Sequence, residues 1–405
     1  MAESIGLVLA GGGARGAYEI GALSVLLPWL DEQDQRPDII VGTSIGALNA
    51  AYLAAHADQK LQGVLDEGRR KWLAIRYRDV LKAVWSLPGL AKLGRLGISV
   101  FFPGVVPSSL LDPAPLVRTV PRLTAVEKIH ANVLDPDVPL RACAVVATEA
   151  HTNRSVVFHD GGSNPASDDR RAIYYAPTEL TADHVRASAA IPVAFPGVEL
   201  SEPEAFQGWY FDGGTRLNAP IKPTLKLGAD RVIVIGLNSV SPQLDLTGGA
   251  EPDLFDGASQ IVQGLLVDPL VQDLETLANT NERVLQSGAT HHDGGDRRVI
   301  RYIFVAPERP NQIGEIARAV FERRYGRFRW IGRSLSLALI GRLLGASQNA
   351  TRGELFSYLF FDPEFERELI DLGRADAERW KHDSHDDGAW QQRPLPRPYV
   401  DRRRA

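Results

Sequence analysis

Apolar runs and helical periodicities alternate along most of the chain. Short, nearly uninterrupted apolar runs predict buried strands, and longer stretches with apolar residues every third or fourth position predict helices. The expected strands are Ile5–Ala10, Asp38–Val41, Leu140–Ala147, Ser155–Phe158, Gly208–Phe211, Arg231–Leu237 and Val299–Val305. The expected helices among the first of these strands are Arg15–Leu30 and Ile45–Ala55. This alternation predicts an α/β fold with a mostly parallel sheet flanked by helices.

The remaining segments predict how the chain is divided. The last third, Ile313–Trp380, is mainly helical in pattern, and the proline-rich Phe101–Pro121 is either a cap over a pocket or a connector. Clusters of Gly, Pro and Asp predict loops at His159–Arg170, Ser239–Gly257 and Ser287–Arg298. We therefore expect an N-terminal domain at residues 1–238, a mainly helical extension with one strand at 239–385, and a disordered Pro/Arg-rich tail at 386–405.

A basic stretch precedes an apolar one in the C-terminal part. Five arginines, Arg323, Arg324, Arg327, Arg329 and Arg333, come before Leu335–Ile340 and Leu343-Leu344. A basic end joined to an apolar helix can lie on an anionic membrane surface. A core helix with a solvated basic start is the simpler interpretation, and it is the one we favour.

Composition and charge exclude several classes of protein. Of 405 residues, 44% are hydrophobic and 23% charged, which is ordinary for a globular protein, and the net charge of -5 argues against a nucleic-acid partner. The single cysteine, Cys143, excludes an intramolecular disulfide, and its apolar neighbours predict that it is a small core residue. Neither a secretory signal nor a run of about 20 apolar residues is visible. We therefore expect a cytoplasmic protein, with peripheral membrane contact left open.

A glycine-rich loop follows the first predicted strand. Its sequence is Gly11-Gly12-Gly13-Ala14-Arg15-Gly16, and the first predicted helix begins there. Successive glycines let backbone N–H groups converge on one point, where a phosphate or a developing oxyanion can bind. The same residues satisfy the dinucleotide-binding pattern G-x-G-x-x-G. That alternative requires an acidic residue at the end of the second strand, and this strand ends Ile40-Val41-Gly42-Thr43-Ser44, so oxyanion binding is favoured.

A second motif, Gly42-Thr43-Ser44-Ile45-Gly46, has the pattern G-x-S-x-G and lies between a predicted strand and a predicted helix. This is the context in which such a turn raises a nucleophilic serine above a sheet. The alternative is a structural turn in which Ser44 caps the helix. The glycine-rich loop about thirty residues earlier, one βαβ step away, favours the nucleophile.

A serine nucleophile requires a base, and none of the nine histidines is a convincing candidate. His184 lies in a helical pattern, and His291 and His292 lie in a hydrophilic loop. The carboxylate candidate is Asp212, which ends an aromatic strand and is followed by Gly213-Gly214.

The two glycines turn the chain away and leave room beside the Asp212 carboxylate. Two further Asp-Gly-Gly triplets begin at Asp160 and Asp293. Asp293 has no strand before it, whereas Asp160 does follow one, so context alone leaves Asp160 open.

The three motifs together resemble the patatin-like phospholipase family. The resemblance covers at least Ile5 to Pro220, and the Asp212 triplet continues through Asn218 and Pro220 as in bacterial members. The segments Arg186–Pro196, Tyr358–Phe365 and Leu372–Ala377 are also similar to that family. The resemblance implies a Ser–Asp dyad, no metal, and hydrolysis of lipid esters. It implies that the oxyanion hole comes from Gly11, Gly12, Gly13, Arg15 and Gly16.

The resulting hypothesis is a serine acyl hydrolase in which Ser44 attacks an acyl ester and Asp212 accepts its proton, with no cofactor. Arg15 either fixes the shape of the glycine-rich loop, which we favour, or binds a lipid phosphate. Three alternatives use the same motifs: an acyltransferase with an alcohol in place of water, a dinucleotide-dependent oxidoreductase, and a non-catalytic membrane-binding protein.

Overall fold

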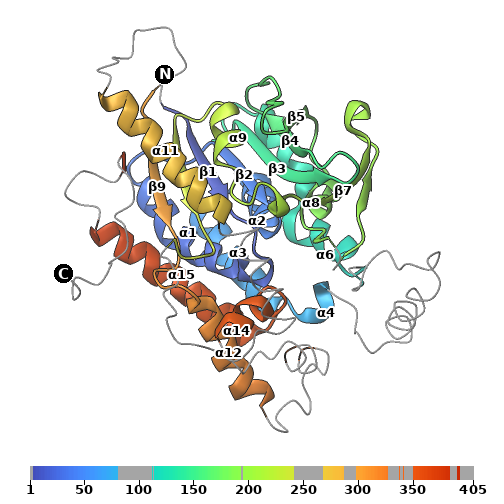
Figure 1. The fold of residues 1–405 in the computed structure, drawn as a ribbon, viewed down its shortest axis with the longest axis vertical. Helices are drawn as coiled ribbons and strands as arrows, with labels where there is room; N and C mark the ends of the chain where they lie inside the picture. The colour runs from blue at the N-terminus through green and yellow to red at the C-terminus, as the bar shows by residue number, and fades with distance from the viewer. Residues whose placement is uncertain are drawn as a thin grey trace.

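In the computed structural model, nine strands among the described residues form one sheet at the centre of the molecule (Figure 1). The structure describes residues 3–80, 112, 114–192, 195–240, 268–286, 298–326, 337, 341, 350–383 and 390–392. The strands are β1 (Ile5–Leu9), β2 (Ile39–Thr43), β3 (Ala142–Glu149), β4 (Ser155–Gly161), β5 (Ile173–Pro177), β6 (Val198–Leu200), β7 (Gly208–Asp212), β8 (Arg231–Ile235) and β9 (Arg301–Val305). Their order is β5-β4-β3-β2-β1-β8-β9, with β7 joining β3 and β6.

Neighbouring strands from β3 through β2, β1 and β8 to β9 are parallel, and β4 and β7 run antiparallel to β3. The predicted α/β fold with a mostly parallel sheet is therefore confirmed. Each predicted strand is present, with ends shifted by a few residues. The short strands β5 and β6 were not predicted, and β4 extends to Gly161, into the predicted loop that starts at His159.

Helices cover both faces of the sheet, as the buried parallel strands require. The helices are α1 (Gly16–Asp31), α2 (Ile45–Ala55), α3 (Leu61–Ala74), α4 (Tyr77–Val80), α6 (Leu116–Thr124), α7 (Ile129–Leu134), α8 (Ala182–Ser188), α9 (Ile221–Lys226), α11 (Asp268–Gln286), α12 (Gln312–Tyr325), α14 (Ala350–Ser357) and α15 (Pro363–Asp383). Alternate residues of β1 face opposite helices: Leu7 lies near Leu53 of α2, whereas Gly6 contacts Thr224 of α9. Figure 1 shows α11 crossing the front of the sheet.

The C-terminal part of the chain is built into the same core. β9 pairs with β8, and α15 packs along α1, where the hydroxyl of Tyr18 donates a 2.8 Å hydrogen bond to Asp376. Residues 390–392, within the predicted disordered tail, also dock: Gln391 pairs with Tyr302 of β9. β8 and β9, which follow the three motifs in sequence, thus belong to the same sheet as β1, and α15 packs beside α1.

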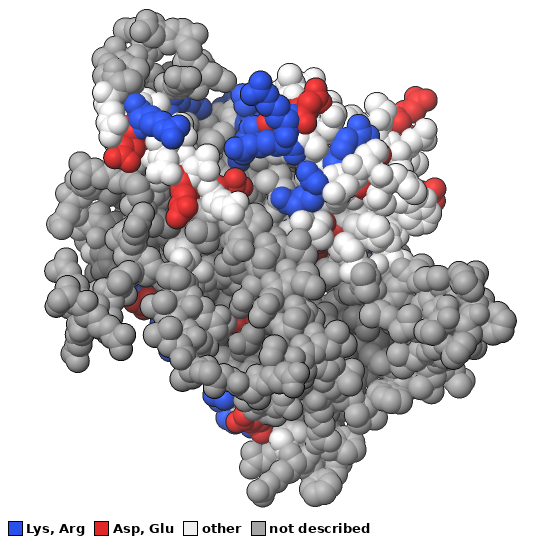
Figure 2. All heavy atoms as spheres, in the orientation of Figure 1, with Lys and Arg blue, Asp and Glu red and all other residues white. Residues whose placement is uncertain are grey.

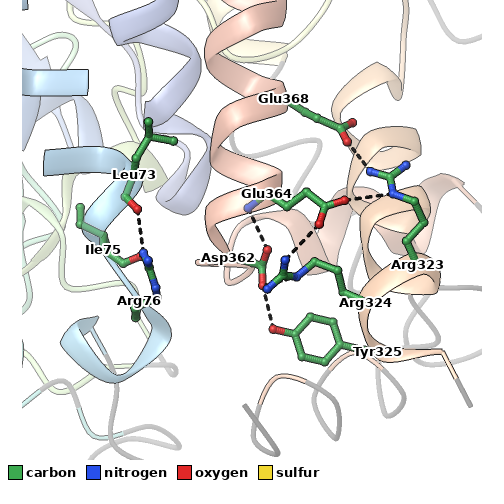
Figure 3. A network of polar contacts seen from close by, with 9 residues as sticks. All are labelled: Leu73, Ile75, Arg76, Arg323, Arg324, Tyr325, Asp362, Glu364 and Glu368. Atoms are coloured by element: carbon green, nitrogen blue, oxygen red, sulfur yellow. Dashed lines mark hydrogen bonds and ion pairs between the residues drawn. The ribbon is translucent and has the colours of Figure 1, made fainter. Parts of the chain in front are cut away.

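The first two arginines of the basic stretch are paired with acids (Figure 3). Arg323 contacts Glu364 and Glu368, and Arg324 contacts Asp362 and Glu364, all from α15 or the residue before it. These two arginines therefore belong to a contact between α12 and the start of α15. The apolar stretch predicted after them lies almost entirely outside the described residues, so the choice between a core helix and a membrane-surface helix stays a prediction.

Other predictions lie partly or wholly outside the described residues. These are Arg327, Arg329, Arg333, Leu335–Ile340, Leu343-Leu344, most of Phe101–Pro121 and of the loops at 239–257 and 287–298, and the tail apart from 390–392. Within the described part of the chain, no helix is long and apolar enough to cross a membrane.

The Tyr18–Asp376 hydrogen bond yields a stability prediction. Tyr18→Phe leaves the buried Asp376 without this donor, so the free energy of unfolding should fall by about 1–3 kcal/mol. The matched control is Tyr174→Phe, because the Tyr174 hydroxyl donates a similar bond to Asp169 at the surface, and its effect should stay within about 0.5 kcal/mol. Chemical denaturation of both variants measures the difference, and equal effects would contradict a buried role for Tyr18.

Candidate active site

Ser44 lies on a sharp turn between β2 and α2, at the carboxyl edge of the sheet. Its backbone has φ 56° and ψ -121°, a conformation that a residue with a side chain rarely adopts. The flanking glycines allow the turn because a Cβ on Gly42 would lie 2.1 Å from the carbonyl oxygen of Gly46, and one on Gly46 would lie 2.3 Å from that of Leu9. The local geometry is therefore that of a nucleophile elbow.

Ser188, at the end of α8, supports this strained turn. Its hydroxyl accepts a 2.9 Å hydrogen bond from the N–H of Ser44 and donates a 2.6 Å hydrogen bond to the carbonyl oxygen of Val146. No role was predicted for Ser188 from the sequence. Its only signal there was its place in the family-like segment Arg186–Pro196.

Asp212 ends β7 beside Ser44. The Ser44 hydroxyl donates a 2.5 Å hydrogen bond to Oδ2 of Asp212, and the Gly214 N–H donates a 2.7 Å hydrogen bond to Oδ1. Both side chains are buried. Burial raises the pKa of Asp212 to about 6, against the lowering effects of its two hydrogen bonds. The carboxylate is thus a stronger base than an exposed one and is still ionised at neutral pH.

Strand register separates Asp212 from the other Asp-Gly-Gly triplets. Asp212 lies opposite Ala147 of β3, whereas Asp160 lies opposite Cys143, near the other end of that strand. Four residues of strand correspond to about 13 Å. The Asp160 carboxylate accepts a hydrogen bond from the ring of His130. Asp293 lies outside the described residues.

His184 has a structural role away from Ser44. Its Nδ1 accepts a hydrogen bond from the N–H of Thr181 at the start of α8, its Nε2 lies 3.0 Å from the carbonyl oxygen of Glu202, and its ring packs at a tilt against Phe158. Burial lowers the pKa of His184, so the ring stays neutral at physiological pH. His291 and His292 fall outside the described part of the chain.

Some N–H groups of the glycine-rich loop donate hydrogen bonds within the protein, and others do not. The Gly11 N–H donates to Asn218, and the N–H groups of Arg15 and Gly16 donate to carbonyl oxygens of the loop itself. Among the described residues, no acceptor faces the N–H groups of Gly12 and Gly13. Of the five loop residues predicted to form the oxyanion hole, Gly12 and Gly13 are thus the ones whose N–H groups have no partner among the described residues, and their role as donors stays a prediction.

The Arg15 side chain turns away from Ser44 and is fully buried. Its guanidinium donates hydrogen bonds of 2.7 Å to Ser357, to Asn238 and to the carbonyl oxygen of Glu354, and it also pairs with the Glu354 carboxylate. The guanidinium is therefore engaged by protein groups and not free to bind a lipid phosphate, which supports the prediction that Arg15 fixes the shape of the loop.

Metal and dinucleotide chemistry gain no support from the described residues. No cluster of three or more His, Cys, Asp or Glu side chains suits a metal ion there. β2 ends at Thr43, whose hydroxyl donates to the carbonyl oxygen of Leu217, and no acidic residue ends that strand to bind a ribose. Cys143 is buried within β3, where burial raises the pKa of its thiol.

Comparison with known families agrees with this geometry. The family model described as patatin-like phospholipase matches residues 7–225, just over half of the chain, and this range includes the glycine-rich loop, Ser44 and Asp212. The chain belongs to the patatin-like phospholipase family. In this patatin-like protein, the matched range ends within α9, so β8, β9 and the C-terminal helices lie beyond it.

Relatives match only part of the patatin-like chain or match it distantly. Lysophospholipase nte1 of Aspergillus terreus is 51% identical over 56 residues, which is 14% of this chain and 3% of that protein. Lysophospholipase NTE1 of Chaetomium globosum is 48% identical over 56 residues, again 14% of this chain and 3% of that protein.

Three solved structures are similar at low TM-scores, so the family assignment rests on the family model. VipD from Legionella pneumophila has a TM-score of 0.34 and 16% identity over 76% of this chain and 62% of its own. Human GIVD cytosolic phospholipase A2 has a TM-score of 0.29 and 12% identity, and the match covers 93% of this chain and 60% of its own. ExoU of the ExoU–SpcU complex from Pseudomonas aeruginosa has a TM-score of 0.26 and 13% identity, and the match covers 94% of this chain and 76% of its own.

The pKa of Asp212 predicts an effect on stability. Because its pKa is about 6 in the folded protein and 3.8 in an unfolded chain, the folded state binds the extra proton between these values, and stability falls as pH rises from about 4 to about 6. At neutral pH the cost is roughly 3 kcal/mol. Asp212→Asn should therefore raise the free energy of unfolding at pH 7 and have little effect below pH 4. Urea denaturation at both pH values measures this, and a less stable variant at pH 7 would contradict it.

Proposed function

We propose that this patatin-like protein is a serine acyl hydrolase that cleaves fatty-acyl esters of lipids, with Ser44 as nucleophile and Asp212 as base. The observation that carries the proposal is the 2.5 Å hydrogen bond from the Ser44 hydroxyl to the buried Asp212 carboxylate. A serine on an elbow, paired with a base and beside two free backbone donors, is the arrangement that acyl transfer requires.

The reaction proceeds in two halves. Ser44 Oγ attacks the ester carbonyl carbon as its proton passes to Asp212, and the N–H groups of Gly12 and Gly13 bind the resulting oxyanion. The tetrahedral intermediate collapses, the alcohol leaves with the proton from Asp212, and the acyl group remains on Ser44. Water then attacks the acyl-enzyme and gives its proton to Asp212, which returns it to Ser44 as the fatty acid leaves.

Two features support a lipid substrate. The family is one of phospholipases, and the 56-residue match to lysophospholipases makes lysophospholipids a first choice for assay. Peripheral contact with a lipid surface belongs to the same proposal.

On the face shown in Figure 2, the part made of described residues carries both basic and acidic side chains. Lys and Arg side chains gather there around α9. Lys222 of α9 is paired with Asp168, and Arg171 is paired with Asp273. Membrane contact through this face would therefore not depend on a uniformly basic patch.

The proposal predicts the pH dependence of the reaction. Asp212 must be ionised to accept a proton, so kcat/KM should rise with pH through about 6 and then level off. A soluble short-chain ester assayed from pH 4.5 to 8 measures this limb without a lipid interface. A limb near 7 that disappears in His184→Ala would instead assign the base to the histidine.

The deciding experiment measures hydrolysis of p-nitrophenyl esters of graded chain length, a lysophospholipid and a diacyl phospholipid. Ser44→Ala should abolish turnover, and Asp212→Asn should lower kcat about 10⁴-fold. Asp160→Asn, which removes the carboxylate of another Asp-Gly-Gly triplet, should stay within a few-fold of wild type.

A fluorophosphonate should label Ser44 but not the neighbouring Ser188, as read by mass spectrometry. Labelling at Ser188, or turnover by Ser44→Ala, would refute the dyad. Adding an acceptor alcohol and measuring acyl transfer against hydrolysis distinguishes the acyltransferase alternative.

A further inference from the structure

The glycine-rich loop is held by residues far beyond the family-matched range. Glu354 and Ser357 lie near the end of α14, and Tyr358 follows directly. They lie more than 300 positions from the loop in sequence, and residues 7–225 contain none of them. We call Glu354, Ser357 and Tyr358 the C-terminal clamp.

The clamp surrounds the Arg15 guanidinium. Nε donates to the Ser357 hydroxyl, and Nη2 donates to both the carbonyl and the carboxylate of Glu354. The guanidinium carbon lies 3.9 Å from the centre of the Tyr358 ring, within cation–π range. Nη1 donates to the side-chain oxygen of Asn238. Four of the five N–H donors of the Arg15 guanidinium are therefore hydrogen-bonded, and these bonds hold the side chain in place.

The clamp also contacts the loop backbone at the residues that matter for catalysis. The carbonyl oxygen of Tyr358 accepts a 3.0 Å hydrogen bond from the N–H of Ala14. Gly13 has φ 59°, and a Cβ there would lie 2.2 Å from the same oxygen. The Tyr358 carbonyl therefore packs directly against Gly13, whose N–H is one of the two proposed oxyanion donors.

The clamp is itself anchored to the C-terminal helices. The second carboxylate oxygen of Glu354 accepts a 2.7 Å hydrogen bond from the N–H of Gly314 in α12, and Ser357 donates to the carbonyl oxygen of Glu354. A buried Arg–Glu pair is an inefficient source of stability, because desolvation offsets much of the attraction. Its hydrogen-bonding geometry instead specifies one loop conformation.

We propose that the C-terminal clamp positions the oxyanion loop, so that residues 354–358 belong to the catalytic apparatus although they lie outside residues 7–225, the range that the family model matches. This rests on the proposed function. Glu354, Ser357 and Tyr358 are positioning residues: they act through Arg15 and Gly13 and do not touch the substrate. Loosening the clamp should weaken stabilisation of the oxyanion while leaving binding of the neutral ester unchanged.

The test compares Glu354→Gln and Ser357→Ala with Phe321→Leu. The first two keep the size of the side chain nearly constant and weaken the hold on Arg15. The control alters the aromatic cluster of Phe321, Phe356 and Phe360 in the same helical layer without touching Arg15. Each protein is assayed for kcat and KM on a soluble ester, for the midpoint of unfolding, and for inhibition by an alkyl trifluoromethyl ketone, which adds to a catalytic serine to form an oxyanion.

In the clamp variants, kcat should fall roughly 10- to 100-fold with little change in KM, because oxyanion donors act mainly on the transition state. The inhibition constant of the ketone should rise in proportion, and the pH limb near 6 should stay in place. Phe321→Leu should lower the unfolding midpoint while kcat stays within about 2-fold, as expected for a core change that leaves the site intact.

Two results would overturn the inference and separate it from the proposed function. Clamp variants that fold and retain full kcat, or that lose kcat without weaker ketone binding, would overturn the clamp alone. Wild-type protein with neither ester turnover nor labelling of Ser44 would overturn the proposed function and the clamp together.

Discussion

The hydrogen bond between Ser44 and Asp212 depends on how the sheet ends. β2 stops at Thr43, opposite Val146 of β3, and β7 pairs with the next residues of β3. Asp212 therefore meets the turn that carries Ser44 because both strands share β3 as a neighbour. The carboxylate must be buried to reach the serine, and burial raises its pKa. The requirement that the Asp212 carboxylate be buried beside Ser44 thus accounts for the strained turn, the hydrogen bonds of Ser188 and Gly214, and the basicity of the site.

The fold and the central pair could be predicted from local sequence. The long apolar runs of β1, β3 and β8 are buried on both sides, so each predicts a strand without knowledge of its neighbours. Ser44 and Asp212 each lie in a short motif with glycines. β5 and β6 were missed because they are short edge elements whose strand conformation depends on pairing with β4 and β7.

The supporting residues could not be predicted, because they act through contacts between distant segments. Ser188 contacts Ser44 across 144 positions, and Ser357 contacts Arg15 across 342. No local pattern marks either serine. Arg15 illustrates the same limit, since its sequence allowed both a structural role and phosphate binding, and only its complete burial distinguishes them. The restriction of free loop donors to Gly12 and Gly13 likewise depends on Asn218 and Tyr358.

The order of the clamp along the chain has a consequence for synthesis. Ser44 and Asp212 leave the ribosome well before Tyr358, and at typical elongation rates the interval between Asp212 and Tyr358 is roughly 7 to 30 seconds. During that interval the nascent chain holds both members of the proposed dyad, while Arg15 lacks Glu354, Ser357 and Tyr358, the residues proposed to order the loop. If the clamp orders the loop as proposed, a chain arranged in this way would reach its full activity only after its C-terminal helices had been made and docked, and an unfinished chain would be much less active.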